Sequence, residues 1–208
     1  KMKLKYSKVG EFVPVISKKG LYYGGYQNSL GDLGVSKFYR DRSCVVTAFT
    51  NAYLYMYHPR EKFSLKDYND YHYDFYKKIR PHIYGVPTAG ALNRRVNRIR
   101  RDRDLNLYAH IMQEYFVRQH TTEEKIAFIN EALRKNCPVI FINWVSKNVK
   151  VLAHHGVTIT ECNDMGDYHE LVISSWGRVY KINFEIFDKQ LKSYSGFIYF
   201  ERYDYEIH

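Results

Sequence analysis

The hydrophobic pattern changes character near Pro138, and this change constrains the fold more than any other feature of the chain. Before it, apolar residues recur at helical spacing in 44–58, 64–79, 90–116 and 121–135. After it, runs rich in β-branched and aromatic residues predict strands at 138–145, 155–162, 168–175, 178–184 and 197–203. The sequence therefore predicts an α+β fold. A helical N-terminal half packs against an antiparallel β-sheet C-terminal half, with a cleft between them.

Three local signals refine this prediction. Thr121 and Glu124 have the spacing of a capping box, which opens a helix. The segment 163–167 (NDMGD) predicts a hairpin turn between the second and third strands. A short helix is expected at 184–192, between the last two strands.

Length and composition indicate one folded domain spanning residues 1–208. The chain has 208 residues, of which 45% are hydrophobic, so it can bury a core and wholesale disorder is excluded. No run approaches the roughly 18 apolar residues of a membrane span. The basic N-terminal segment is not followed by an apolar stretch, so no signal peptide is visible and cytoplasmic and secreted locations both stay open.

The charge balance favours acidic partners. Lys and Arg number 32 against 22 Asp and Glu, a formal net charge of +10. The densest basic cluster is 94–103, where Arg94, Arg98 and Arg101 share one face of the predicted helix. Such a stripe could neutralise phosphates, but no recognition-helix or RNP-type motif accompanies it, which disfavours nucleic acid. We expect either a solvated face or recognition of an acidic peptide, with Arg94 and Arg98 as candidate substrate-binding residues.

The chain has three cysteines, Cys44, Cys137 and Cys162, so at least one thiol is unpaired within the chain. No two of them have the spacing of a metal clip, and the histidines show no metal-ligand pattern, so neither a metal nor a cofactor is expected. A free thiol is then either a small core residue or a nucleophile.

Cys44 stands at the first turn of the apolar helix 44–58, which Asp41 or Ser43 could cap. The free N–H groups and positive dipole end of a helix N-terminus favour a thiolate, and they can also bind an oxyanion. Gln27, in a glycine-rich loop upstream, is a candidate side-chain donor to the same oxyanion. The competing interpretation is a buried structural cysteine.

A base for this thiol must come from elsewhere in the chain. His155 begins an alternating strand and shares a face with Val157 and Ile159. If that face packs on the central helix, His155 points at Cys44 and His154 points away. The competing interpretation is a half-buried strand histidine bonded to the backbone.

The end of the next strand could hold the imidazole. Ser174 or Ser175 could reach a ring nitrogen of His155, and Trp176 could shield that bond from water or contact substrate. Asn183 and Asp167 are further candidates for the same role.

Four motifs follow one another along the chain: YYGGYQ, the helix start at Cys44 with Thr47 and Ala48 after it, HHGVTIT, and ISSWG. In this order they resemble the papain-like cysteine peptidases, and most of all a bacterial branch related to the double-glycine (bacteriocin-processing) peptidases. The resemblance spans residues 22–177, although 60–135 match no motif of that family.

The resemblance implies a papain-like fold and a peptide or protein substrate. It also implies Gln27 as oxyanion-hole donor, Cys44 as nucleophile, His155 as general base and Ser174 as the residue that orients the base. The expected activity is that of a cysteine peptidase or amidase acting through a thioester.

Three positions depart from the family's pattern: Val45 follows the nucleophile where glycine is usual, Gly156 follows the histidine, and Ser174 stands where Asn or Asp is expected. A hydroxyl stabilises an imidazolium less than a carboxylate does. A catalytically weak or inactive relative that binds peptides is therefore one alternative, and a basic nucleic-acid-binding module is another.

Overall fold

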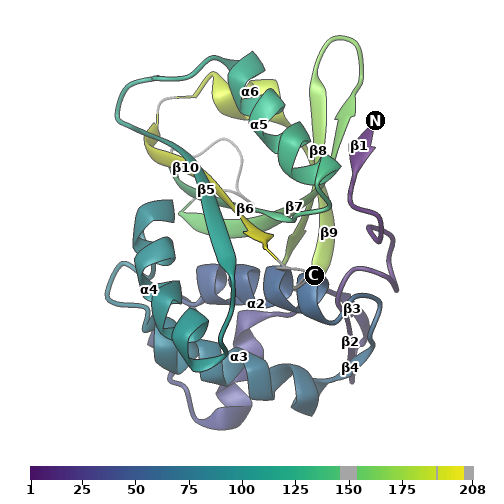
Figure 1. Cartoon of the computed structure of the whole chain (residues 1–208), viewed down its shortest axis with the longest axis vertical. Coiled ribbons are helices and arrows are strands. Elements are labelled where there is room, and N and C mark those ends of the chain that lie inside the picture. The colour runs from purple at the N-terminus through teal and green to yellow at the C-terminus, as the bar shows by residue number, and fades with distance from the viewer. Residues whose placement is uncertain (146–153, 191, 204–208) are drawn as a thin grey trace, which may run out of the picture.

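The computed structural model describes residues 1–145, 154–190 and 192–203. Within these residues the chain is an α+β protein with seven helices and a mostly antiparallel main sheet. Figure 1 shows the N-terminal helices gathered on one side of this sheet and two later helices, α5 and α6, on its opposite side.

The main sheet is formed almost entirely by the second half of the chain. Its strands lie in the order β5-β10-β6-β7-β8-β9, with β1 paired to β7. The bounds are β1 Met2–Lys3, β5 Leu107–Tyr115, β6 Val139–Val145, β7 His155–Asp164, β8 His169–Ser175, β9 Arg178–Asn183 and β10 Lys192–Arg202. Every pairing in this sheet is antiparallel.

The remaining elements belong mostly to the first half. The helices are η1 Gln27–Leu33, α1 Lys37–Arg40, α2 Cys44–Tyr57, α3 Leu65–Ile79, α4 Ala89–Asp102, α5 Thr122–Arg134 and α6 Phe184–Asp188. A small sheet of order β3-β2-β4 flanks them, with β2 Pro14–Ser17, β3 Gly20–Tyr23 and β4 Phe63–Ser64.

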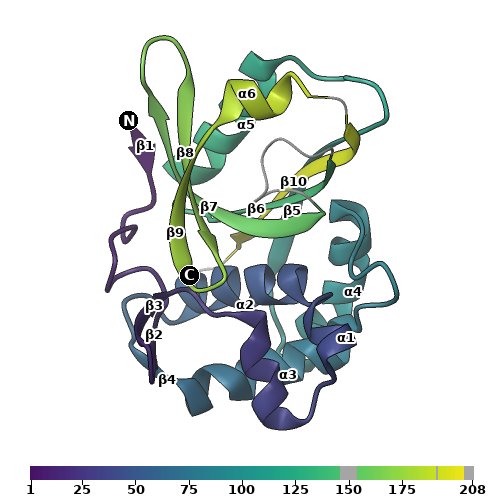
Figure 2. The ribbon, with the colours of Figure 1, turned by 180° about the vertical axis from the view of Figure 1, so that it is seen from behind.

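Helix α2 is the centre of the molecule, because apolar residues surround it on nearly every side. Phe49 contacts Phe75 of α3 on one side and Phe200 of β10 on another, with ring centroids 5.4 Å apart in both pairs. Figure 2 shows α2 running beneath the main sheet, with α3 on its other side. The first turn of α2 is thereby held at the junction of the helices and the sheet.

Most of the elements predicted from local pattern are confirmed. Helix 44–58 is α2, and the predicted capping box opens α5, where both reciprocal hydrogen bonds of Thr121 and Glu124 are formed. The predicted turn at 163–167 joins β7 to β8, and the short helix near 184 is α6. We expect a loop at 146–154, between the first two predicted strands, and residues 146–153 of it lie outside the described residues.

The prediction of a single helix over 90–116 is wrong. Helix α4 ends at Asp102, Asp104 has a positive φ of 51°, and residues 107–115 form strand β5. The strand is fixed by its pairing with β10, from the far end of the chain. Local pattern does not contain that partner, and tertiary context overrides propensity here.

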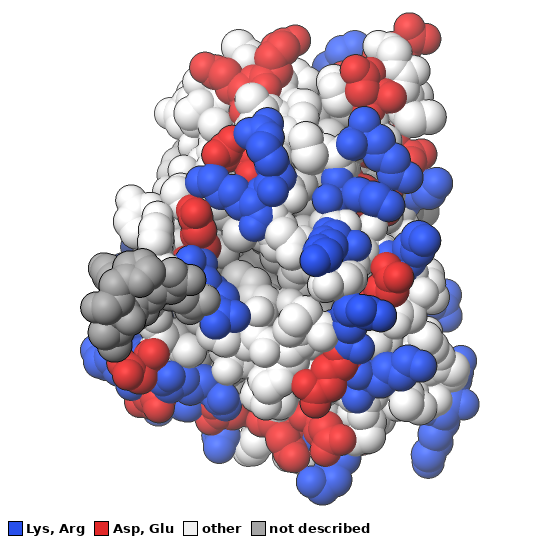
Figure 3. Space-filling model, turned by 45° about the vertical axis from the view of Figure 1, so that its right-hand side comes forward, with Lys and Arg blue, Asp and Glu red and all other residues white. Residues whose placement is uncertain are grey.

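On one face of the molecule the basic side chains are interspersed with acidic ones. Figure 3 shows Lys and Arg scattered across the face it presents, interrupted by acidic groups. Among the helices of the described residues, none combines the length and apolarity that a membrane span requires.

Candidate active site

Cys44 is the first residue of α2, as the sequence predicts. Ser43 precedes it as the N-cap, but its hydroxyl donates to the carbonyl of Tyr39 and does not cap the helix N–H groups. These N–H groups therefore remain available at the helix start. Cys44 is half-buried, whereas Cys137 and Cys162 are buried.

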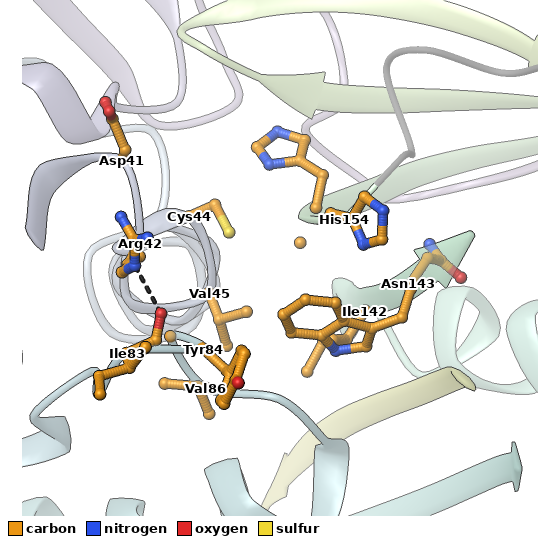
Figure 4. A pocket seen from close by; sticks show the side chains of 14 residues that line it. Asp41, Arg42, Cys44, Val45, Ile83, Tyr84, Val86, Ile142, Asn143 and His154 are labelled. Carbon is orange, nitrogen blue, oxygen red and sulfur yellow. Dashed lines mark hydrogen bonds between the residues drawn. The ribbon is translucent and has the colours of Figure 1, made fainter. Parts of the chain in front are cut away.

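A cavity of about 310 Å³ opens beside the thiol and contains both Cys44 and His155 in its lining. Figure 4 shows the Cys44 side chain leaving the end of α2 towards the side of the pocket where His154 lies. Ile83 and Tyr84 close another side. Cys44 and His155 thus line the same pocket, although they are 111 positions apart in the sequence.

Gly156 allows the sheet to approach the helix start this closely. A Cβ added at Gly156 would lie 2.6 Å from Cγ2 of Val45 and 3.4 Å from its backbone nitrogen. The backbone N–H groups of Gly156, Val45 and Cys44 itself all favour the ionised sulfur of Cys44. Val45 and Gly156, two of the departures from the peptidase pattern, therefore pack directly against each other, and the absence of a side chain at Gly156 leaves room for Val45.

The face of β7 that carries Val157 and Ile159 does not pack on α2, so the condition under which His155 would point at Cys44 from that face is not met. Gly156 faces α2, so by strand alternation Thr158 also faces it, whereas Val157 lies on the opposite face. Phe141, paired with Val157, confirms this, because its ring packs on Phe187 of α6 at 5.1 Å. His155 reaches the pocket because it is the first residue of β7, at the end of the strand.

Ser175, rather than Ser174, contacts the catalytic candidate His155. Its hydroxyl lies 2.6 Å from Nε2 of the imidazole. Ser174 pairs with Thr158 on the face towards α2, where its hydroxyl donates to the carbonyl of Tyr23 at 2.6 Å. Ser174, which the resemblance implies as the orienting residue, does not contact His155, because alternation along β8 places it on the other face of the sheet.

Trp176 covers the imidazole. Its ring stacks on that of His155, with centroids 4.7 Å apart and planes 21° apart. Trp176 and Gly177 both have positive φ, 49° and 71°, in the two-residue turn between β8 and β9. A turn of this kind reverses the chain tightly and brings the indole over the neighbouring strand. The side chain thus shields the ring, but it is not among the described residues that line the pocket.

The remaining predicted site residues lie elsewhere. Gln27 is buried at the start of η1, and Arg94 and Arg98 are exposed on α4. None of the three lines the pocket within the described part of the chain. The loop before Gln27 is nevertheless tied to the central helix, because Gly25 N–H donates to Oδ1 of Asn51 at 2.8 Å.

Burial sets the protonation states of both reactive groups. It raises the pKa of the Cys44 thiol, and the nearby N–H groups offset only part of that rise. It also lowers the pKa of His155 to about 4. Both groups are therefore neutral at pH 7, whereas the sequence favoured a resting thiolate. A neutral imidazole is the form that can accept a proton.

Several pocket residues were not predicted. Ile83, Tyr84, Val86 and Trp144 line it, as does His154, which was expected to point away. No pattern in the sequence places Ile83, Tyr84 and Val86 at the pocket, because the loop that contains them reaches it only in the folded molecule. Asn143, the cross-strand partner of His155, also lines the pocket. Its Oδ1 accepts from Ser195 at 3.0 Å, and its buried Nδ2 has no hydrogen-bond partner among the described residues.

No group of three or more His, Cys, Asp or Glu side chains in the described ranges could hold a metal ion. No protein-family model matches the chain, and no curated protein matches it significantly.

Proposed function

We propose that this protein has a papain-like arrangement and acts as a cysteine peptidase or amidase, with Cys44 as nucleophile and His155 as general base. The observation that carries the proposal is the shared pocket: a half-buried cysteine at a helix start and a neutral imidazole line the same cavity. Nucleophilic catalysis by cysteine needs this pair of groups in one accessible space.

The proposed reaction starts from the neutral pair. With Nε2–H donating to Ser175, Nδ1 of His155 carries the lone pair that takes the thiol proton. The sulfur attacks the carbonyl carbon, the C–N bond breaks, and Nδ1 returns the proton to the leaving amine. Nδ1 then takes a proton from water as the water attacks the thioester, which releases the acid and restores the thiol.

The negative oxygen of each tetrahedral intermediate would lie at the start of α2. The N–H groups there are not used by Ser43, and the helix dipole favours negative charge. Each donor in a comparable oxyanion hole lowers the activation free energy by about 2.7–4 kcal/mol. Gln27 stays a proposed second donor on the strength of the resemblance alone.

The pocket walls favour a substrate with an apolar side chain next to the scissile bond. Val45, Val86 and Ile142 supply aliphatic surface, and Trp144 is fixed by a hydrogen bond from Nε1 to the carbonyl of Pro87 at 2.9 Å. Apolar walls with few polar groups are typical of pockets that bind an apolar group. A peptide fits this description better than a charged small molecule.

One observation favours a second candidate function, a peptide-binding protein without catalysis. Within the described residues, no hydrogen bond joins the thiol to the imidazole, and burial disfavours the ionised form of both. Such a protein would bind the same peptides in the same pocket and leave them intact.

Thiol alkylation combined with hydrolysis distinguishes these functions. We expect iodoacetamide to label Cys44 before Cys137 and Cys162, because Cys44 is the less buried thiol, and at a rate that rises with pH, because burial raises the pKa of Cys44. We also expect cleavage of a mixed peptide library, lost in Cys44→Ala and retained in Cys137→Ser. Binding of peptides without any cleavage would favour the non-catalytic function, and equal labelling of all three thiols would contradict the assignment of Cys44 as nucleophile.

A further inference from the structure

Strand β5 forms one edge of the main sheet, and its hydrogen bonds show which backbone groups face outwards. Its register with β10 is continuous from Leu107 to Tyr115. Just beyond each end, the even-numbered residues bond towards β10: Phe116 N–H donates to Ser193 O, and Tyr203 N–H donates to Asn106 O. In an antiparallel ladder such bonding alternates, so the odd-numbered residues of β5 direct their N–H and C=O groups away from the sheet.

The backbone groups that β5 directs away from the sheet accept hydrogen bonds at both ends of the strand but, among the described residues, have none in its middle. Leu107 O accepts from Nε of Arg100, and Tyr115 O accepts from the N–H of Val117. No hydrogen bond in the described part of the chain reaches the outward N–H and C=O groups of Ala109, Ile111 and Gln113. These three residues are only half-buried.

Open strand edges are usually protected. Proteins blunt them with lysine, proline, bulges or a covering element. Strand β5 reads LYAHIMQEY and contains no lysine and no proline, and its register with β10 shows no bulge. Its unguarded stretch is therefore available to pair with an added strand.

Helix α4 packs on the face of the sheet next to this edge, where it contacts both β5 and β10. Arg100 bonds to Leu107, and a Cβ built on Gly90 would lie 3.8 Å from Nε2 of Gln113 and 3.6 Å from the guanidinium of Arg94. Helical spacing places Arg101 and Arg94 on the side of α4 that contains Gly90. Both arginines are exposed, and neither has an ion-pair partner in the described residues.

We propose that the open edge of β5 binds an extended acidic peptide, which adds to the sheet as a further strand with its carboxylates towards Arg94 and Arg101. The charges decide against a second copy of this chain. Two β5 edges paired by a two-fold axis would bring the arginines of one α4 against those of the other. Exposed main-chain donors and acceptors in a row also match a peptide backbone rather than a phosphate backbone.

The direct test measures binding of a fluorescein-labelled peptide of alternating valine and glutamate by fluorescence anisotropy. Ile111→Pro removes one outward donor, and the ladder to β10 survives because proline is tolerated where the N–H faces away from the sheet. We expect Ile111→Pro to weaken binding roughly tenfold, and Ile111→Val, which keeps the donor, to bind like the original chain. Circular dichroism checks that each variant is folded.

A second measurement does not depend on the variants folding. The same peptide, N-methylated at alternate residues along one edge, cannot pair with β5, and we expect it not to bind. We expect the double variant Arg94→Ala, Arg101→Ala to lose affinity and salt dependence, while Lys18→Ala, in the turn between β2 and β3, keeps both.

Three results would overturn the proposal: unchanged binding to Ile111→Pro, equal binding of a valine–lysine peptide, or a dimer in solution that Ile111→Pro dissociates. The proposal does not rest on the proposed hydrolysis. Cys44→Ala should bind the acidic peptide normally, so the two ideas fail separately.

Discussion

Gly156 of β7 lies against Val45 of α2 so closely that one added methyl group would come within 2.6 Å of Val45 Cγ2. This contact brings the first turn of the helix and the first residues of the strand together, and with them Cys44 and His155. The chemistry proposed for the pocket therefore depends on a packing contact between two residues that have no chemistry of their own.

Gly156→Ala should lower the free energy of unfolding by about 1–3 kcal/mol, because the new methyl group overlaps Val45. It should also slow hydrolysis, since β7 must move away from the helix start. Val45→Ala removes the overlapping Cγ2, so the double variant should regain part of the lost stability. Denaturant unfolding of the four proteins measures this coupling. Additive losses would contradict direct packing.

Ser175→Ala should reduce the rate of hydrolysis roughly tenfold, because His155 loses the partner at Nε2 that sets its tautomer and orientation. We expect the effect on kcat rather than on KM. Ser174→Ala is the matched control, since its hydroxyl bonds to Tyr23 O on the other face. If Ser174→Ala lowered kcat while Ser175→Ala did not, the assignment made here would be reversed.

Stability should fall as the pH drops from about 6.5 towards 4. Burial lowers the pKa of His72 to about 3 and that of His155 to about 4, against an ordinary value of 6.5. Below pH 6.5 the unfolded chain therefore binds protons that the folded chain does not, and each histidine costs up to about 1.4 kcal/mol per pH unit. Above pH 6.5 both histidines are neutral in the folded and the unfolded chain, so they no longer make the stability depend on pH.

The interval between pH 6.5 and 5 isolates these histidines, because the buried carboxylates titrate lower. Urea unfolding at several pH values should give a smaller slope for His72→Gln than for the original chain. Nε2 of His72 is hydrogen-bonded to Oγ1 of Thr47 at 2.8 Å, and a glutamine side chain can form such a bond without titrating. An identical slope in the two proteins would rule out the burial argument for His72.

Lys125→Met should destabilise the fold by about 3–5 kcal/mol, because it removes the cation paired with buried Glu114, whereas Asp188 keeps its ion pairs with Arg118 and Lys192. Lys125 is 2% exposed, and its Nζ lies 2.5 Å from both Glu114 and Asp188. Lys66→Met breaks an exposed pair with Asp70 and should cost less than about 1 kcal/mol. Thermal unfolding of both variants would show whether burial makes this difference.

The parts of the fold governed by local chemistry could be predicted from sequence. The apolar helix α2 and the capping box at Thr121 depend on neighbouring residues alone, and both are present. Strand β5 was mistaken for helix, because its identity depends on its pairing with β10, which begins 77 residues after the end of β5.

The candidate site divides in the same way. Cys44 and His155 were found from residue type and position, and the distinction between Ser174 and Ser175 follows from strand alternation once β8 is known to face α2 through Ser174. The pocket wall formed by Ile83 and Tyr84 could not be predicted, because a loop's position depends on the whole fold.

The most direct test of the proposed activity is labelling with a peptidyl vinyl sulfone, followed by mass spectrometry of the modified peptide. The thiol sulfur adds to the alkene while the imidazole transfers the thiol proton to the neighbouring carbon, so the reaction needs both groups. The account predicts a single adduct on Cys44 that is lost in His155→Ala, although iodoacetamide still labels Cys44 in that variant. An adduct that forms equally well without His155, or no adduct at all on Cys44, would contradict it.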